Sequence, residues 1–275
     1  MSNRTNRLTA IGICSLALLS WETNALAMPQ ELTIPTGLYV GFFGGGGSLS
    51  STDATQRGTA FYLESSDLGG PLSVNVDGHL NSHSTGFGGA HVGFGFKKPC
   101  WFFTPSIELE GYYLGSTLNG HFDSATTALP EHNFDVSLPM HGGVFLVNTV
   151  FTFDNTYFSR VRPYVGAGIG GAALRISGAS ATQINPPEPN VNHFNSGPSG
   201  SDGAFAGQVK AGLSFEITKH VNLFAEYRFL YLSGTSYAFG STEYPLIGHP
   251  ATSPWIVSTN GLRYNFGAAG IEFSV

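Results

Sequence analysis

The sequence is poor in charged residues and lacks long apolar runs beyond its N-terminus. Only 11% of its 275 residues are Asp, Glu, Lys or Arg, whereas a soluble domain of ordinary composition carries about 25%. So few charges argue against an ordinary cytosolic protein with a surface facing water. No stretch after residue 27 approaches the roughly 20 consecutive apolar residues of a membrane-spanning helix, which argues against a helical membrane protein.

The N-terminus has the features of an export signal. Arg4 and Arg7 precede an apolar run over residues 8–19, and Ala25-Leu26-Ala27 offers the small residues that signal peptidase requires. We therefore predict a cleaved signal peptide over residues 1–27 and a mature domain over residues 28–275.

Cysteine and basic residues are also scarce. Cys14 lies in the predicted signal peptide, so the mature chain keeps Cys100 alone and cannot form an internal disulfide. Removing Arg4, Arg7 and Glu22 leaves 12 − 2 = 10 basic and 18 − 1 = 17 acidic residues, a net charge of −7. This balance argues against nucleic acid as a partner, while 22 Phe and 11 Tyr argue against disorder.

What the chain has in abundance is alternation of apolar and polar residues. Over residues 205–217 the odd positions are apolar and several even positions are polar or charged, and residues 221–231 repeat the pattern. A period of two is typical of a strand with two unlike faces. We predict eight such strands at about 37–50, 86–97, 104–117, 138–154, 161–177, 204–217, 221–236 and 260–275.

The predicted connections alternate between long and short. Four long ones span residues 51–85, 118–137, 178–203 and 237–259, and three short ones span residues 98–103, 155–160 and 218–220. Long loops at one end, tight turns at the other and an even strand count are typical of a transmembrane β-barrel. The sequence thus predicts an all-β, eight-stranded antiparallel, up-and-down transmembrane barrel with long, mobile external loops.

The position of the charges predicts which face of the strands points outward. They are too few to cover an exterior, so we place them in the lumen, where unpaired charges are costly and a paired network is expected. Eight strands leave a lumen that side chains can fill, which argues against an open pore. The predicted network consists of Glu108, Glu110, Arg162, Lys210, Glu216, Glu226, Arg228 and Arg263.

Aromatic residues and the last strand add two further expectations. An aromatic girdle is expected at the short turns and along the outer face of residues 227–231, from Trp101, Phe102, Phe103, Tyr157, Phe158, Tyr227, Phe229 and Tyr231. In the last strand the apolar residues change from even to odd positions, and we predict a β-bulge at residues 267–270.

Three segments resemble a known family. They are Gly37-Leu38-Tyr39-Val40-Gly41, the glycine-rich run over residues 162–170 and the run over residues 205–215. They are similar to the OmpA-like and opacity-type outer-membrane β-barrels, which are mostly surface antigens, adhesins and envelope-structural proteins. Such barrels usually end in Phe, whereas this chain ends in Val275, with Phe273 keeping the apolar alternation.

Motifs that could carry chemistry have a structural explanation. Residues 166–171 match G-x-G-x-x-G, but the following residues continue as strand instead of the helix that dinucleotide binding needs, so we attribute these glycines to a crowded lumen. Residues 44–47 lack the Lys-Ser/Thr of a phosphate loop. His79 and His83, near Asp77, are expected to be solvated loop residues, whereas His91 and His141 are expected to face the lumen. We predict no cofactor, metal or catalytic residue.

The leading functional hypothesis is a non-enzymatic outer-membrane surface protein with an envelope-structural role, a role as an adhesion or host-contact antigen, or both. It would be a monomer in contact with membrane lipid and lipopolysaccharide, and its loops 51–85, 118–137, 178–203 and 237–259 would contact a host or cell-surface ligand. A narrow passive, porin-like channel is the alternative. A lipid-modifying enzyme ranks third, because no nucleophile signature such as G-x-S-x-G occurs.

Overall fold

The computed structural model describes residues 37–96, 103–153, 160–244 and 249–275, apart from the side chain of His83. No helix long and apolar enough to cross a membrane occurs in this part of the chain. Its main elements are eight long strands, β1 (Gly37–Phe61), β2 (Pro71–Gly95), β3 (Phe103–Ser124), β4 (Asn133–Phe153), β5 (Val161–Ser177), β7 (Ser199–Thr218), β8 (Val221–Leu232) and β12 (Leu262–Ser274).

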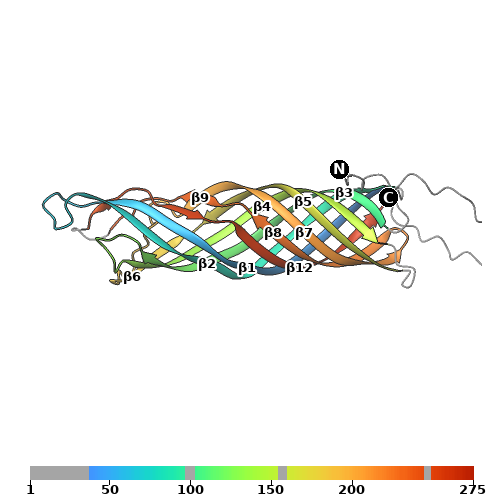
Figure 1. Cartoon of the computed structure of the whole chain (residues 1–275), viewed down its shortest axis with the longest axis horizontal. Coiled ribbons are helices and arrows are strands. Elements are labelled where there is room, and N and C mark those ends of the chain that lie inside the picture. Colours follow the sequence, from blue (N-terminus) through green and yellow to red (C-terminus); the bar gives the residue numbers. More distant parts are fainter. Residues whose placement is uncertain (1–36, 97–102, 154–159, 245–248) are drawn as a thin grey trace, which may run out of the picture. The chain divides into compact units, whose positions relative to one another are not determined.

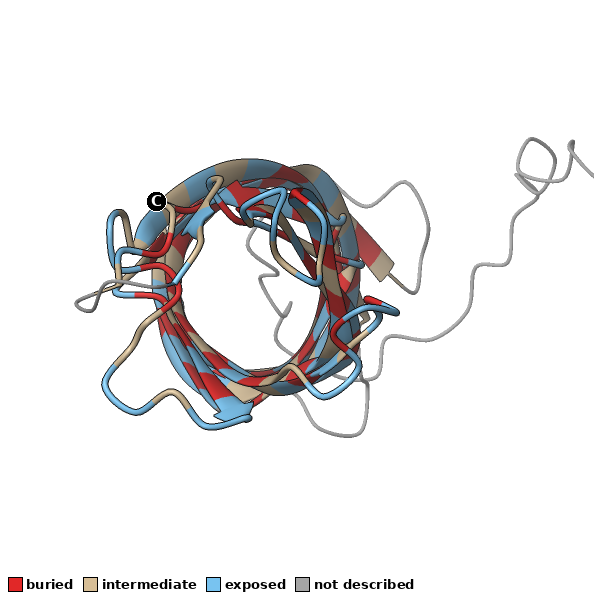
Figure 2. Cartoon of the chain, turned by 90° about the vertical axis from the view of Figure 1, so that its left-hand side faces the viewer, coloured by how far each residue is buried: buried red, intermediate tan, exposed pale blue. Residues whose placement is uncertain are grey.

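The long strands form a closed antiparallel ring. Each pairs with its neighbours in the order β1-β2-β3-β4-β5-β7-β8-β12, and β12 pairs back with β1 from Tyr39 opposite Ser274 to Leu49 opposite Tyr264. This confirms the predicted antiparallel barrel. Seen from the side it is elongated, and seen along its axis it is a ring in which buried and exposed residues alternate (Figures 1 and 2).

Four short strands extend the wall of the barrel away from the described termini. They are β6 (Ser180–Asn185), β9 (Thr235–Ala238), β10 (Ala251–Thr252) and β11 (Ile256–Thr259). β6 pairs with β4, β9 pairs with β11, and β10 and β11 pair with the second half of β1. We call this end the distal half of the barrel, and the end that holds Gly37 and Val275 the basal half.

The prediction of long, mobile loops is wrong for most of their length. β1 and β2 stay paired as far as Phe61 opposite Pro71, and β3 and β4 as far as Phe122 opposite Phe134. Strand pairing satisfies the backbone hydrogen bonds that a loop would leave to water. The longer distal connections between named strands are 62–70, 125–132, 186–198 and 239–250, the last described except for residues 245–248, and we call these four the distal loops.

The outer face of the barrel changes polarity along its length. On β3, Ile107, Leu109 and Tyr113 point outward with 47%, 63% and 58% of their surface exposed. Further along the same strand the outward residues are polar: Thr117, Asn119, His121 and Asp123. The exposed apolar residues of the basal half form a ring that we call the apolar belt, and it includes Leu38, Phe94, Leu109, Phe151, Val165 and Leu213.

The inner face changes polarity in the opposite sense. On β3 the buried Glu108 and Glu110 are followed, on the same face, by Leu114, Leu118 and Phe122, which are fully buried. In the basal half the lumen is therefore polar beneath an apolar exterior. In the distal half an apolar core lies beneath a mainly polar exterior, from which Phe61, Ile184 and Ile256 are the large apolar exceptions on strands. A barrel with these two halves fits lipid at one end and water at the other.

The predicted bulge in β12 is wrong, and the inversion of polarity explains the sequence pattern that suggested it. Its pairing with β8 runs without a register shift from Leu262 opposite Leu232 to Phe273 opposite Val221. The even residues point inward throughout, and they are apolar near Tyr264 because the distal interior is apolar. The odd residues near Phe273 are apolar because they belong to the belt. The pattern changes phase because the environment changes, with no bulge.

Candidate functional site

The charged cluster of the lumen is positioned by three strands. Glu108 and Glu110 lie on β3, Lys210 on β7, and Glu226 and Arg228 on β8, all on inward-facing positions. Residues two apart on a strand share a face, so Glu108 and Glu110 both point into the lumen, as do Glu226 and Arg228. We call these five residues the lumen network.

Ion pairs connect the network across the lumen. The Nζ atom of Lys210 lies 2.5 Å from Glu108 Oε2 and 3.3 Å from Glu110 Oε2. Arg228 donates to Glu110 Oε1 at 2.6 Å and to Glu226. Because all five side chains are nearly or fully buried, these pairs exchange hydration for fixed partners, and each charge depends on the others.

Neutral polar side chains complete the hydrogen bonding of the network. Gln208 and Asn148 donate to Glu110 at 3.1 and 3.2 Å. The hydroxyl groups of Tyr39 and Tyr164 donate to Glu108 and Glu226 at 3.0 and 2.8 Å. None of these residues was among the sequence-predicted site residues. They occupy the same alternate, inward-facing strand positions as the charged residues, and this was the signal that could have found them.

Aromatic residues cover the distal side of the network. The guanidinium carbon of Arg228 lies 3.9 Å from the centroid of the Phe43 ring, and the rings of Phe87 and Tyr112 are within 6 Å of it. This geometry adds cation–π attraction to the ion pairs. Beyond these rings, Leu114 and Leu230 are fully buried in the distal core, so side chains fill the lumen above the network.

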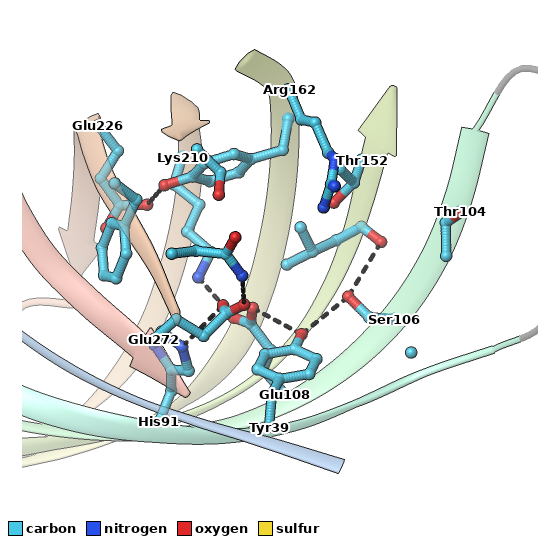
Figure 3. A pocket seen from close by; sticks show the side chains of 16 residues that line it. Tyr39, His91, Thr104, Ser106, Glu108, Thr152, Arg162, Lys210, Glu226 and Glu272 are labelled. Atoms are coloured by element: carbon cyan, nitrogen blue, oxygen red, sulfur yellow. Dashed lines mark hydrogen bonds and ion pairs between the residues drawn. The ribbon is translucent and has the colours of Figure 1, made fainter. Parts of the chain in front are cut away.

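On the basal side of the network lies a polar cavity (Figure 3). Arg162 pairs with Glu216 there, and His91 Nε2 lies 3.6 Å from Glu272 Oε2. Donor atoms of His91, Glu108 and Glu110 lie within 4.8 Å of one another, as metal ligands would. The ammonium of Lys210 already contacts both carboxylates, so a cation of the protein itself supplies the positive charge at this place.

The structure brings together seven of the eight residues of the predicted network, in two groups. Five form the lumen network, and Arg162 and Glu216 form a separate pair. The prediction is wrong for Arg263, which points outward from β12 and is exposed. The expectation of a charged interior is wrong for the distal half, where the interior is apolar.

The histidines and glycines with a possible chemical role differ in how well their positions match expectation. His91 faces the lumen, but His141 points outward from β4 beside Tyr113, contrary to expectation. His79 lies in β2 on the outer wall, 2.8 Å from Asp53, instead of in a loop. The side chain of His83 lies outside the described residues. A Cβ atom on Gly168 would collide with Asn148, which supports the crowded-lumen explanation of these glycines.

The predicted aromatic girdle is described only in part. Phe103 contacts Phe151 and Phe153 on the basal outer wall, and Tyr227, Phe229 and Tyr231 lie on the outward face of β8. Trp101, Phe102, Tyr157 and Phe158 lie outside the described residues, as does the predicted signal peptide.

A second cluster of titratable residues lies at the distal end. Glu188, His193 and His249 come from the connections 186–198 and 239–250, and His132 ends the connection 125–132. Burial lowers the pKa of His193 to about 4, and burial also raises the pKa of Glu188. We call these four residues the distal cluster.

A closed barrel with an apolar outer belt and a charged, filled lumen defines a transmembrane β-barrel. Residues 14–245 match the family model described as outer membrane protein beta-barrel domain. The match covers more than half of the chain, so the chain belongs to this family and resides in the outer membrane. No curated protein matches the sequence.

Solved barrels show remote likeness. The outer membrane protease OmpT from Escherichia coli aligns with a TM-score of 0.44 at 6% identity, covering 88% of this chain and 97% of its own. OprG from Pseudomonas aeruginosa aligns with a TM-score of 0.42 at 10% identity, covering 89% of this chain and 99% of its own. Neisserial surface protein A aligns with a TM-score of 0.32 at 15% identity, covering 87% of this chain and 98% of its own. Likenesses of this strength carry no argument about activity.

Proposed function

We propose that this protein is a non-enzymatic surface protein of the OmpA-like and opacity type, which contacts other cells or host surfaces through its distal half. The observation that carries the proposal is the inverted polarity of that half. Gly115–Ser124 of β3 lie beyond the belt. At roughly 3.3 Å per residue and a tilt of about 40°, such a segment raises the distal loops by roughly 25 Å above the membrane.

The chemistry of the distal loops supports a contact role and narrows the partner. The four loops contain Glu64, Asp67, Glu131, Glu188 and Glu243 but no Lys or Arg. A surface of this kind favours a partner that offers positive charge or hydrogen-bond donors over an anionic polysaccharide. Leu63, 77% exposed, adds an apolar contact at one tip. We further propose that the barrel is a monomer in contact with membrane lipid and lipopolysaccharide.

The test is adherence of cells that display the protein. A non-adherent laboratory Gram-negative strain expressing the full chain is expected to bind epithelial or macrophage monolayers several-fold more than the same strain with an empty vector. A tip variant carrying Glu64→Gln, Asp67→Asn and Glu243→Gln is expected to lose this gain. A matched wall variant, Asp53→Asn with Asp77→Asn, changes exposed acids on β1 and β2 and is expected to keep it.

Two outcomes would count against the proposal. Equal adherence of expressing and empty cells on both monolayers would remove the contact role, and loss of adherence in the wall variant alone would move it from the loops to the barrel wall. The lipid A and phospholipid profiles of the expressing cells are expected to be unchanged, because the barrel is proposed to be non-enzymatic. A changed profile would favour the lipid-modifying alternative.

A narrow passive channel is the second candidate, and the polar cavity on the basal side of the lumen network favours it. Under the leading proposal the refolded barrel is silent in a planar bilayer, because the network and the apolar distal core fill the lumen. Steady conductance steps that change in Arg228→Ala or Glu226→Ala would instead favour the channel.

A further inference from the structure

The distal cluster surrounds a small cavity of about 60 Å³ at the end of the barrel. Tyr244 and Trp255 form part of its wall, and His249 stacks on Tyr244 with ring centroids 4.3 Å apart. A cavity of this size has room for an ion or a few water molecules, which makes the polar atoms that face it informative.

The ring orientation of His193 fixes which of its nitrogens is an acceptor. Its Nδ1 atom lies 3.1 Å from the carbonyl oxygen of Ala181, which can only accept, so Nδ1 carries the hydrogen. The ring of Phe134 packs edge-on against it at 4.9 Å. In the neutral ring Nε2 is therefore a lone-pair donor. A backbone carbonyl that holds the other ring nitrogen is also the usual support of a metal-binding histidine.

The Nε2 atom of His193 faces another acceptor. Glu188 Oε2 lies 3.5 Å from it and is buried with no hydrogen-bond partner. The second oxygen, Oε1, lies 4.0 Å from Nδ1 of His249. The buried Nδ1 atom of His132, in the same cavity, is also without a partner. Buried acceptors that face one another are costly unless a proton or a metal ion lies between them.

The geometry points to a divalent transition-metal site in which Glu188 and His193 are the central ligands, and in which His249 and His132, which line the same cavity, move toward the ion to complete the set. Histidine nitrogen and carboxylate oxygen are common ligands of Zn²⁺ at about 2.0–2.2 Å. Two ligand atoms on one tetrahedral ion then lie about 3.4 Å apart, close to the separation of Glu188 from His193. His249 is more exposed and stands further out, so the ion would draw it inward.

A cation at this place would join three of the four distal loops. His132 ends the loop between β3 and β4, Glu188 and His193 belong to the loop between β6 and β7, and His249 precedes β10. Binding would fix the arrangement of these loops at the contact surface. The site stands whether or not the contact function does, because it rests only on the cavity and its ligands.

The test is calorimetric titration of Zn²⁺ into the full mature barrel, folded in detergent and freed of metal with a chelator. Saturable binding of one ion per barrel is expected. Glu188→Gln is expected to weaken binding at least tenfold while leaving the barrel folded, because the amide can still donate to His193 Nε2. Exchange of the backbone amides of residues 186–198 is expected to slow with Zn²⁺ in the wild type and to stay unchanged in Glu188→Gln.

His121→Ala is the matched control. His121 pairs with Asp123 and Asp135 on the exposed outer wall, so it could bind Zn²⁺ on its own, and its removal is expected to leave the affinity unchanged. Absence of saturable binding to the wild type would overturn the site. Binding that survives Glu188→Gln but is lost in His121→Ala would place the ion on the wall and overturn it as well.

Discussion

Arg228 holds the lumen network together, because it is fully buried and its guanidinium contacts Glu110 and Glu226. Replacing it with Met keeps most of the volume but leaves these two carboxylates without their main cation. Removing one partner of a buried ion pair costs about 3–5 kcal/mol. We therefore predict that Arg228→Met lowers the free energy of unfolding by about this amount, measured by urea unfolding of the barrel in lipid vesicles.

Arg263→Met is the control for this experiment. Arg263 belonged to the same predicted network but is exposed on the outside of β12, and surface substitutions usually change stability by less than about 0.5 kcal/mol. Equal losses of stability in the two variants would contradict the assignment of Arg228 to the network and Arg263 to the wall.

His121 offers a prediction about proton binding on the distal outer wall. The hydrogen bond that the His121 ring donates from Nδ1 to the Asp135 carboxylate, 3.0 Å away, is the largest cause that raises the pKa of His121 above 6.5, and Asp123 adds to it. A raised pKa means that the favourable interaction is present below the unfolded pKa and is lost as pH rises through the folded pKa. We expect an NMR titration to give a pKa above 6.5.

The two acidic partners of His121 should differ in effect. Asp135→Asn is expected to move the pKa of His121 down further than Asp123→Asn, whose carboxylate stands at 3.3 Å. A larger shift from Asp123→Asn would contradict the described geometry. Because His121 is about half exposed, this pair is a probe of local structure and not a main source of stability.

At the scale of a single strand, β3 explains what could be predicted from the sequence and what could not. Its basal part alternates Ile107 and Leu109 with Glu108 and Glu110, a contrast that identifies the strand and its outward face at once. In its distal part the apolar residues, Leu114, Leu118 and Phe122, occupy the even, inward positions, and polar residues occupy the odd, outward ones. If one polarity is expected along the whole strand, this second pattern is mistaken for a loop.

The same strand gives a matched pair of substitutions. Leu109 and Asn119 both point outward from β3, but Leu109 belongs to the apolar belt and Asn119 to the polar wall. Arg on the lipid face of a barrel costs about 2–4 kcal/mol near the bilayer midplane. We predict such a loss of unfolding free energy for Leu109→Arg in vesicles.

Asn119→Arg is expected to change the free energy of unfolding by less than about 0.5 kcal/mol, because its side chain lies in water. Similar costs at the two positions would mean that the boundary between lipid and water does not lie between them. The comparison thus tests the polarity inversion without altering the interior of the barrel.

For the whole molecule, charge scarcity and alternation were enough to predict a transmembrane barrel and most of its lumen network. Glu108, Lys210 and Arg228 stood out because charges are rare on such strands. The distal cluster could not be predicted, because Glu188, His193 and His249 are distant from His132 in sequence and meet only when the barrel closes. The partners Tyr39 and Tyr164 were hidden for a related reason, since a tyrosine fits either face of a strand.

The extent of the distal wall leads to a test with two proteases on intact cells. Each of the four distal loops carries one glutamate, at Glu64, Glu131, Glu188 and Glu243, and no basic residue. The exposed basic residues beyond the belt, Arg57, Arg175 and Arg263, lie instead in paired strands.

A glutamate-specific protease is therefore expected to cut the displayed protein in its distal loops, whereas trypsin leaves it intact, because a paired strand cannot enter a protease site without local unfolding. Mass spectrometry of the released or retained fragments locates each cut. Cleavage by trypsin after Arg57 would mean that residues 51–85 form the mobile loop suggested by their composition. Resistance to both enzymes would mean that the distal half does not face the outside of the cell.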